Sequence, residues 1–185
     1  MTTDKQTRVA VLLGSNRTGS LNRRIAEHLR DHAPAGVVVD VVQGLDAVPF
    51  YNEEIDGETA PESATALRES VAAADRVLAV TPEYNGTMPA VLNNAIDWLS
   101  RPYGQGAIVG KPFAAIGATP TPYGGKWSHE HARHSARIAG ALVVDHIVVD
   151  EPAVNGDPLA DEAAVRRFLD ALDALVAHEA EAAVA

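Results

Sequence analysis

The sequence predicts a doubly wound parallel α/β sheet. Apolar runs alternate with stretches of helical periodicity along the whole chain. Three of the apolar runs are nearly continuous in small and β-branched residues, as expected for strands that helices cover on both faces. The three connections with the most unusual composition all follow apolar runs, where ligands bind in this class of fold.

Five strands and five helices account for this pattern. The expected strands are at 8–13, 37–42, 76–80, 112–117 and 142–149. Asp40 and Asp145 interrupt the second and fifth runs, which places these strands near the sheet edges. The expected helices, with apolar residues at three- and four-residue spacing, are at 20–32, 61–74, 89–99, 126–141 and 161–182.

Residues suited to helix starts precede or open several of these helices. Ser20 is positioned to cap the first helix, and Pro61 and Pro89 suit first helical turns. Asp161 and Glu162 favour the positive N-terminal end of the last helix.

Composition limits both the class and the partners of the protein. The 185 residues, 46% of them hydrophobic, suit one domain over 1–185, with frayed ends at 1–7 and about 180–185. No apolar segment approaches the ~20 residues of a membrane span. The polar N-terminus predicts a cytoplasmic protein. The absence of cysteine excludes disulfides and thiolate sites, and a net charge of −10 disfavours nucleic acid.

The first unusual loop, 14–20, follows the first strand and reads GSNRTGS. Its glycines leave backbone N–H groups free at a helix N-terminus. Side-chain donors are added by Ser15, Thr18, Ser20 and Asn22. Arg17 adds a positively charged guanidinium with several N–H donors, so a phosphate monoester is the ligand that fits this loop best. The loop lacks the lysine of a Walker motif and the three glycines of a dinucleotide fingerprint. A mobile connection without a ligand is the alternative.

The second loop, 81–87, reads TPEYNGT. Pro82 fixes a turn, Gly86 permits close approach, and Tyr84 offers an aromatic face, so a planar heterocycle would fit against it. In the alternative interpretation, Glu83 caps the following turn and Tyr84 covers apolar surface.

Together these loops resemble those of the NADPH-dependent FMN reductase family. Its patterns Gly-Ser-x-Arg-x-x-Ser-x-Asn and Pro-Glu-Tyr-Asn-x-x-x-Pro are complete here, and the resemblance extends from VAVLLGSNRTGSLN to GKPFAAIGATPTPYGGKW. It implies a flavodoxin-like fold of three layers, with a five-stranded parallel sheet in the order 2-1-3-4-5.

The resemblance also assigns the cofactor-binding residues. The FMN phosphate would be held by Ser15, Arg17, Ser20 and Asn22. The isoalloxazine ring and ribityl chain would be surrounded by Pro82, Glu83, Tyr84, Asn85 and Gly86. The third loop, 118–125, departs from the family pattern, because Thr119, Pro120 and Thr121 replace Ser-x-Gly, but flavin contact by Thr119, Gly124 and Gly125 is still expected.

By this resemblance, NADPH or NADH passes hydride to bound FMN, and a quinone, azo compound, metal oxyanion or free flavin then takes the electrons in ping-pong order. No catalytic side chain is expected, because the chemistry belongs to the flavin. Two alternatives are a flavodoxin-type electron carrier, which the acidic charge suits, and a non-catalytic flavin-binding regulatory module.

The family further implies a homodimer or homotetramer. Asp97 and Arg101 lie at i, i+4 spacing beside Trp98, and these three residues are the expected interface. His129, His131 and His134 are close in sequence, but unpaired histidines on a solvated or interface helix are favoured over a metal site.

Overall fold

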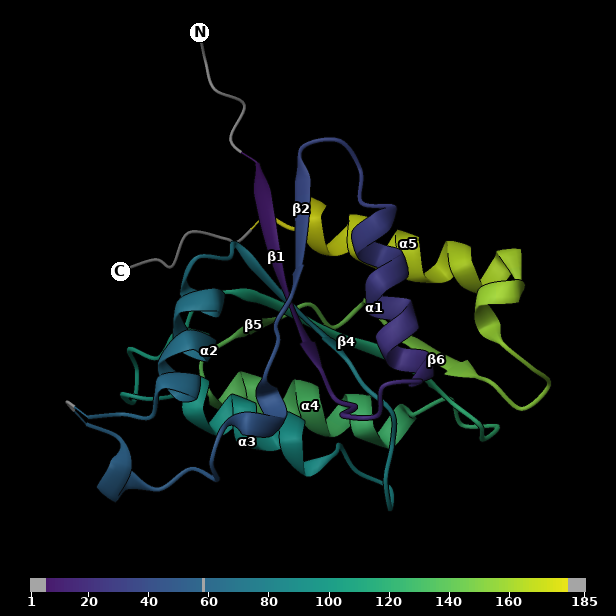
Figure 1. Cartoon of the computed structure of the whole chain (residues 1–185). Coiled ribbons are helices and arrows are strands. Elements are labelled where there is room, and N and C mark those ends of the chain that lie inside the picture. Colours follow the sequence, from purple (N-terminus) through teal and green to yellow (C-terminus); the bar gives the residue numbers. More distant parts are fainter. Residues whose placement is uncertain (1–5, 58, 180–185) are drawn as a thin grey trace, which may run out of the picture.

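Six parallel strands form the sheet in the computed structural model, which describes residues 6–57 and 59–179 (Figure 1). They are β1 (Thr7–Leu13), β2 (Val37–Val41), β3 (Arg76–Val80), β4 (Pro112–Thr119), β5 (Leu142–Val143) and β6 (Val149–Pro152). The order is β2-β1-β3-β4-β5, with β6 also paired to β4. This confirms the doubly wound fold and the predicted order 2-1-3-4-5.

The predicted fifth strand is wrong in its extent. β5 pairs with Pro112 and Phe113, whereas β6 pairs with the second half of β4. Between them the chain turns at Asp145 and His146, which are both exposed. Asp145 accepts a hydrogen bond from Arg137 at 2.6 Å. Two polar residues in an apolar run therefore mark a turn, and the edge carries two short strands.

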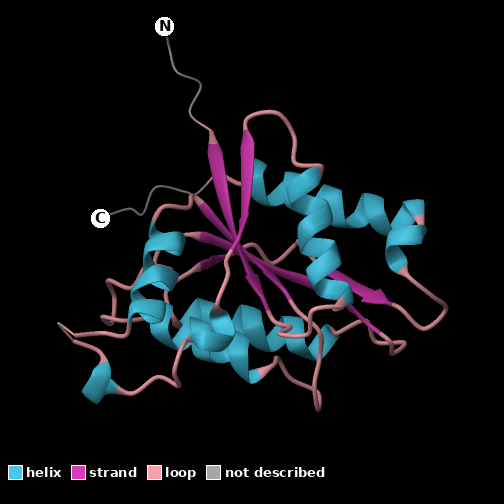
Figure 2. Cartoon of the chain, in the orientation of Figure 1, coloured by secondary structure: helices cyan, strands magenta, loops and turns pink. Residues whose placement is uncertain are grey.

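Helices cover both faces of the sheet, so that the molecule has three layers (Figure 2). They are α1 (Leu21–Asp31), α2 (Glu62–Ala72), α3 (Ala90–Leu99), α4 (Lys126–Ile138) and α5 (Glu162–Ala177). Helices α1 and α5 lie on one face, and α2, α3 and α4 lie on the other (Figure 1).

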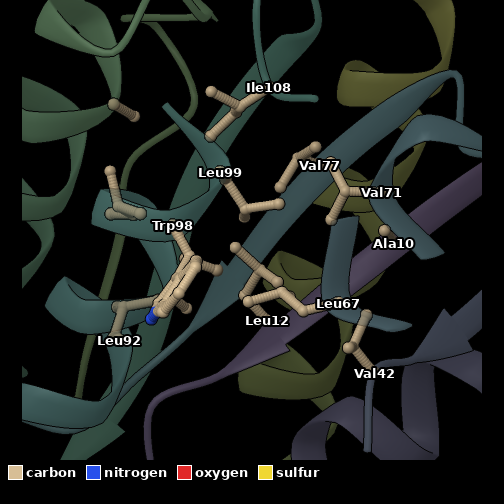
Figure 3. Close-up of a cluster of buried hydrophobic side chains, with 14 of the residues drawn as sticks. Ala10, Leu12, Val42, Leu67, Val71, Val77, Leu92, Trp98, Leu99 and Ile108 are labelled. Atoms are coloured by element: carbon tan, nitrogen blue, oxygen red, sulfur yellow. The ribbon is translucent and has the colours of Figure 1, made fainter. Parts of the chain in front are cut away.

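Strand side chains alternate between two hydrophobic cores, as the period of two in a strand requires. Val9 and Val11 of β1 pack beneath α1 and α5, whereas Ala10 and Leu12 pack beneath α2 and α3. Figure 3 shows the second core, in which Trp98 of α3 lies fully buried. Both faces of the central strands are thus apolar, which explains their continuous hydrophobic sequence.

The helix boundaries follow from local chemistry. The Ser20 hydroxyl accepts from the Arg23 N–H at 3.5 Å, which confirms the predicted cap of α1. The Asp161 carboxylate accepts from the Ala163 N–H at 2.9 Å, which confirms that Asp161 lies at the start of the last helix. Helix α4 ends three residues earlier than predicted, close to Gly140, whose φ of +95° is incompatible with a continuing helix. Helix α5 ends at Ala177, and residues 180–182 of its predicted range lie outside the described residues.

A long connection, called here the 43–60 connection, joins β2 to α2, and it contacts α3 at Pro49 and Tyr51. The Asn94 side chain accepts from the Tyr51 N–H at 2.8 Å and donates to the Pro49 carbonyl at 3.0 Å. The Trp98 indole N–H donates to the same carbonyl at 2.8 Å. Two polar side chains of α3 therefore fix this connection. Within the described residues, no helix is long and apolar enough to cross a bilayer.

Candidate functional site

Three loops meet at the carboxyl edge of the sheet, as predicted. The first loop (14–20) follows β1, the second (81–87) follows β3, and the third (118–125) includes the end of β4. Gly14 donates its N–H to Val80 at 2.9 Å, and a Cβ on Gly14 would lie 2.1 Å from the Thr81 hydroxyl. The first two loops therefore begin in direct contact, which only glycine at position 14 permits.

The first loop presents many donors without protein partners. In the described chain, no acceptor is provided for the backbone N–H groups of residues 15–19 or for the Ser15 hydroxyl, although Ser15 is only 4% exposed. Arg17 is exposed and forms no ion pair with a described residue. Ser20 is buried at the N-terminus of α1, where the helix dipole is positive. This arrangement suits an anion with several oxygens.

Asn22 has a different geometry from the other donors. Its amide oxygen accepts from the Ala118 N–H, and its amide N–H donates to the Ala118 carbonyl, both at 2.9 Å. The side chain is 2% exposed. Asn22 therefore joins the start of α1 to the end of β4, and it holds the first and third loops in register.

The second loop is a tight hairpin anchored to α4. Tyr84 and Thr87 exchange both backbone hydrogen bonds, at 3.0 and 3.1 Å, around Asn85 and Gly86. These two residues have φ values of +53° and +71°, the conformation of a type I′ turn. The hairpin projects Tyr84, which remains 54% exposed.

Glu83 caps the neighbouring helix rather than its own turn. Its carboxylate accepts from the N–H groups of Trp127 and Ser128, at 3.0 and 3.3 Å, in the first turn of α4. The Ser128 hydroxyl donates to the Pro82 carbonyl at 2.8 Å. The second loop and α4 are thereby fixed to each other at a helix start that favours negative charge.

The third loop turns sharply before α4. The Thr119 and Thr121 hydroxyl groups are hydrogen-bonded at 2.9 Å, and Gly124 and Gly125 both adopt positive φ. A Cβ on Gly124 would lie 2.2 Å from the Asp150 carbonyl. The glycine pair therefore allows this loop to pass directly over β6.

We expect that Gly124→Ala destabilises the fold by about 1–3 kcal/mol, because the added Cβ would overlap backbone at a left-handed position. Urea unfolding measures the effect. Gly57→Ala is the matched control, since a Cβ there meets nothing within 4 Å and φ is not positive. Equal unfolding free energies for the two variants would contradict the close packing of this loop against β6.

The structure places the predicted interface residues differently. Trp98 has no exposed surface, so its assignment to an interface is wrong. The reason is that Trp98 faces the second core and the 43–60 connection. Asp97 is half-buried beside α4, and burial raises the pKa of its carboxyl while Arg101 lowers it. Both Asp97 and Arg101 line a groove between α3 and α4 of about 560 Å³.

The three histidines of α4 also separate. His131 and His134 both line the groove, and His131 also hydrogen-bonds to the Thr87 hydroxyl at 2.7 Å. His129 is fully buried, so the expectation of a solvated or interface position is wrong for this residue. Across residues 6–57 and 59–179, no three histidine, cysteine or acidic residues are grouped as a metal site.

Sequence reasoning missed the role of His129. Its ring approaches Asp150 of β6 at 2.6 Å and the Thr81 carbonyl at 3.1 Å. These partners lie 21 and 48 residues away. No local pattern joins residues so distant in sequence, and only the folded sheet brings them together.

Comparisons with known proteins agree with this geometry. The model of the NADPH-dependent FMN reductase family matches residues 7–154. A quinone reductase of Pseudomonas putida is 42% identical over 127 residues, covering 69% of this chain and 68% of the relative. A 2-hydroxy-1,4-benzoquinone reductase of a Burkholderia species is 41% identical over 126 residues, covering 68% of each protein.

Solved structures extend the likeness to the fold. The flavoenzyme FerB of Paracoccus denitrificans, an NAD(P)H:(acceptor) oxidoreductase, superposes with a TM-score of 0.81 at 30% identity, over 92% of this chain and 95% of its own. A flavodoxin of Pseudomonas aeruginosa shares the fold at a TM-score of 0.58 and 19% identity, over 90% and 99%. The chain therefore belongs to the NADPH-dependent FMN reductase family, and it is an oxidoreductase with FMN and NAD(P)H as its cofactors.

Proposed function

We propose that the protein takes hydride from NADPH or NADH onto FMN held by the three loops and then reduces a quinone, azo compound, metal oxyanion or free flavin in ping-pong order. The observation that carries this proposal is the set of unpaired donors in the first loop. Among the described residues, no partner is found for five consecutive backbone N–H groups, a nearly buried serine hydroxyl and an arginine, and all of these lie around one helix N-terminus.

The donor set fits the phosphate of FMN. A phosphate monoester carries close to two negative charges and three terminal oxygens at neutral pH. We assign its binding to Ser15, Arg17 and Ser20. Asn22 supports this group through Ala118, because its bonds to that residue hold the loop in place.

The second and third loops suit the remainder of the flavin. The rigid hairpin at Tyr84–Gly86 would present backbone groups and an aromatic ring at the mouth of the site. We assign Pro82, Glu83 and Asn85 to its support, with Glu83 acting through α4. In the third loop we assign Thr119, Gly124 and Gly125 to the edge of the ring.

Bound FMN supplies the hydride and electron chemistry. The chain itself binds the phosphate, orients the ring and leaves the mouth of the site open to a second substrate. No described residue is assigned as a general acid or base. Because the mouth of the site is open, the nicotinamide and the acceptor can bind there one after the other.

The visible spectrum of the purified protein with FMN tests the proposal. We expect a bound flavin that bleaches when NADPH is added without oxygen and recovers when a quinone is added. A flavin that binds but stays oxidised would contradict the reductase activity and favour a carrier or regulatory module. A protein that does not bind FMN would contradict the site itself.

Arg17→Ala is expected to weaken FMN binding by about 1.5–3 kcal/mol, because a charged hydrogen-bond donor to the phosphate is removed. This corresponds to a Kd increase on the order of 10- to 150-fold. Quenching of flavin fluorescence measures the Kd. Arg30→Ala is the control, since Arg30 lies at the opposite end of α1 and pairs with Asp31. An unchanged Kd in Arg17→Ala would contradict the phosphate assignment.

We further propose a homodimer or homotetramer that assembles through the groove between α3 and α4. Asp97 and Arg101 line it, and Tyr103 and Ile138 expose 84% and 70% of their surface there. Light scattering tests this assembly, and a mass near the 19.5 kDa of one chain would overturn it. The cytoplasmic location stays a prediction from the sequence.

A further inference from the structure

His129 lies directly beneath the candidate site and joins three elements. It belongs to the first turns of α4, Asp150 belongs to β6, and Thr81 follows β3. The imidazole has no exposed surface. Glycines make room for it, because a Cβ on Gly117 or Gly125 would lie 3.0 Å from a ring atom. The ring is therefore held in one position.

Both nitrogens of this ring face oxygen atoms that accept hydrogen bonds. Nε2 lies 3.1 Å from the Thr81 carbonyl, which can only accept. Nδ1 lies 2.6 Å from a carboxylate oxygen of Asp150, which also accepts when it is ionised. A neutral imidazole has one N–H, so it satisfies only one of these contacts. Both are satisfied only when a second proton lies between Nδ1 and Asp150.

The charges around His129 have opposing effects on a protonated imidazole. The positive end of α4 and Arg133, one turn further along this helix, oppose a cation at His129. Glu83, which caps the same helix, favours one, as does Asp150. Lys126 and Glu130 pair with each other on the exposed side of the helix. From β6, the next side chain, Glu151, points to the other face of the sheet, where it pairs with Arg167.

We propose that His129 is a positioning residue of the flavin site: together with Asp150, and with a proton shared between them, it holds the Thr81 carbonyl and so fixes the start of the second loop. Thr81 directly precedes Pro82 and contacts Gly14, so its position governs where the first and second loops meet. Loss of the shared proton releases one of the two contacts. The proposal rests on the proposed function, because it assumes that FMN binds to these loops.

FMN affinity at a single pH tests this contact. At pH ~7.5 the FMN phosphate is already ionised, since its second pKa is about 6. His129→Leu removes the donor to the Thr81 carbonyl, and we expect its Kd to rise roughly tenfold, which corresponds to one unmade hydrogen bond. In Asp150→Asn the amide can donate to Nδ1 of a neutral imidazole, so both contacts persist and the Kd should stay close to that of the wild type.

His129→Gln and His134→Gln complete the design. The glutamine amide can donate to the Thr81 carbonyl, so His129→Gln should recover most of the affinity that His129→Leu loses. His134 lines the groove away from this network, and its variant should bind FMN as the wild type does. A His129→Leu protein with the wild-type Kd would overturn the proposal, as would a His129→Gln protein with the Kd of His129→Leu.

A second readout is independent of the flavin. Nitrogen-15 NMR of the His129 ring should show both nitrogens protonated in the wild type at pH ~6.5, and only Nε2 protonated in Asp150→Asn. A singly protonated wild-type ring would overturn the proposal. A wild-type protein that binds no FMN at any pH would instead overturn the proposed function, and the shared proton would then be decided by the ring spectrum alone.

Discussion

Replacing Trp98 by alanine is expected to lower the free energy of unfolding by about 3–5 kcal/mol, the usual cost of truncating a buried aromatic residue. Trp98 is fully buried in the second core (Figure 3). Its indole N–H donates to Pro49, and its ring meets Tyr51 edge-on with centroids 5.0 Å apart. The alanine variant would leave a cavity and remove one of the two hydrogen bonds to the Pro49 carbonyl, and it would loosen the 43–60 connection.

Urea unfolding at pH 7 measures this loss. Trp98→Phe should recover most of the packing but not the hydrogen bond to Pro49, so its loss should be smaller. Trp127→Ala is the control, because Trp127 is 38% exposed on the surface. Its effect should stay below about 1 kcal/mol. Similar losses in the Trp127 and Trp98 alanine variants would contradict the buried role of Trp98.

Arg68→Ala is expected to lower the free energy of unfolding by about 3 kcal/mol, because it removes the cationic partner of the largely buried Asp56 carboxylate. Arg68 donates to both carboxylate oxygens of Asp56, at 2.7 and 2.8 Å, and to the Trp98 carbonyl at 3.0 Å. The guanidinium also lies 5.1 Å from the centre of the Trp98 ring. The side chain of Asp56 is 11% exposed. Lysine cannot form this two-pronged contact, so Arg68→Lys should remain destabilised.

The same pair predicts an acid-sensitive contribution to stability. Hydrogen bonds from Arg68 lower the pKa of the Asp56 carboxyl below its ordinary value of 3.8, against the opposing effect of burial. The contribution is therefore present above the unfolded-state pKa and is lost as the pH falls through the folded-state value. Unfolding at pH ~3 and pH 7 should show a larger difference in the wild type than in Asp56→Asn. Equal differences would contradict the pairing.

The sequence predicted the sheet well because its central strands are buried on both faces. Short, nearly continuous apolar runs such as β3 (Arg76–Val80) are typical of interior strands, and their boundaries are visible in the composition. The edge was harder to predict. Val144 and Ile147 are buried on either side of an exposed turn, and a run of apolar residues does not show that the strand is interrupted between them.

The candidate site shows a similar division. The loops at the carboxyl edge were located by topology alone, and their donors were recognised from residue type. The long-range partners were not, because Glu83 contacts α4 and Asn22 contacts β4 only after the sheet has formed. Trp98 is different, since a local signal existed. It lies three residues after Ala95, on the apolar stripe of α3.

The division of the sheet edge into β5 and β6 has a consequence for self-association. An uninterrupted edge strand exposes a row of unpaired N–H and C=O groups, to which strands of other molecules can add. Here the edge consists of strands of two and four residues, and a charged turn at Asp145 separates them. Neither strand is long enough to template a stable intermolecular ladder. The interruption therefore protects a Val-rich segment from forming aggregates at high concentration.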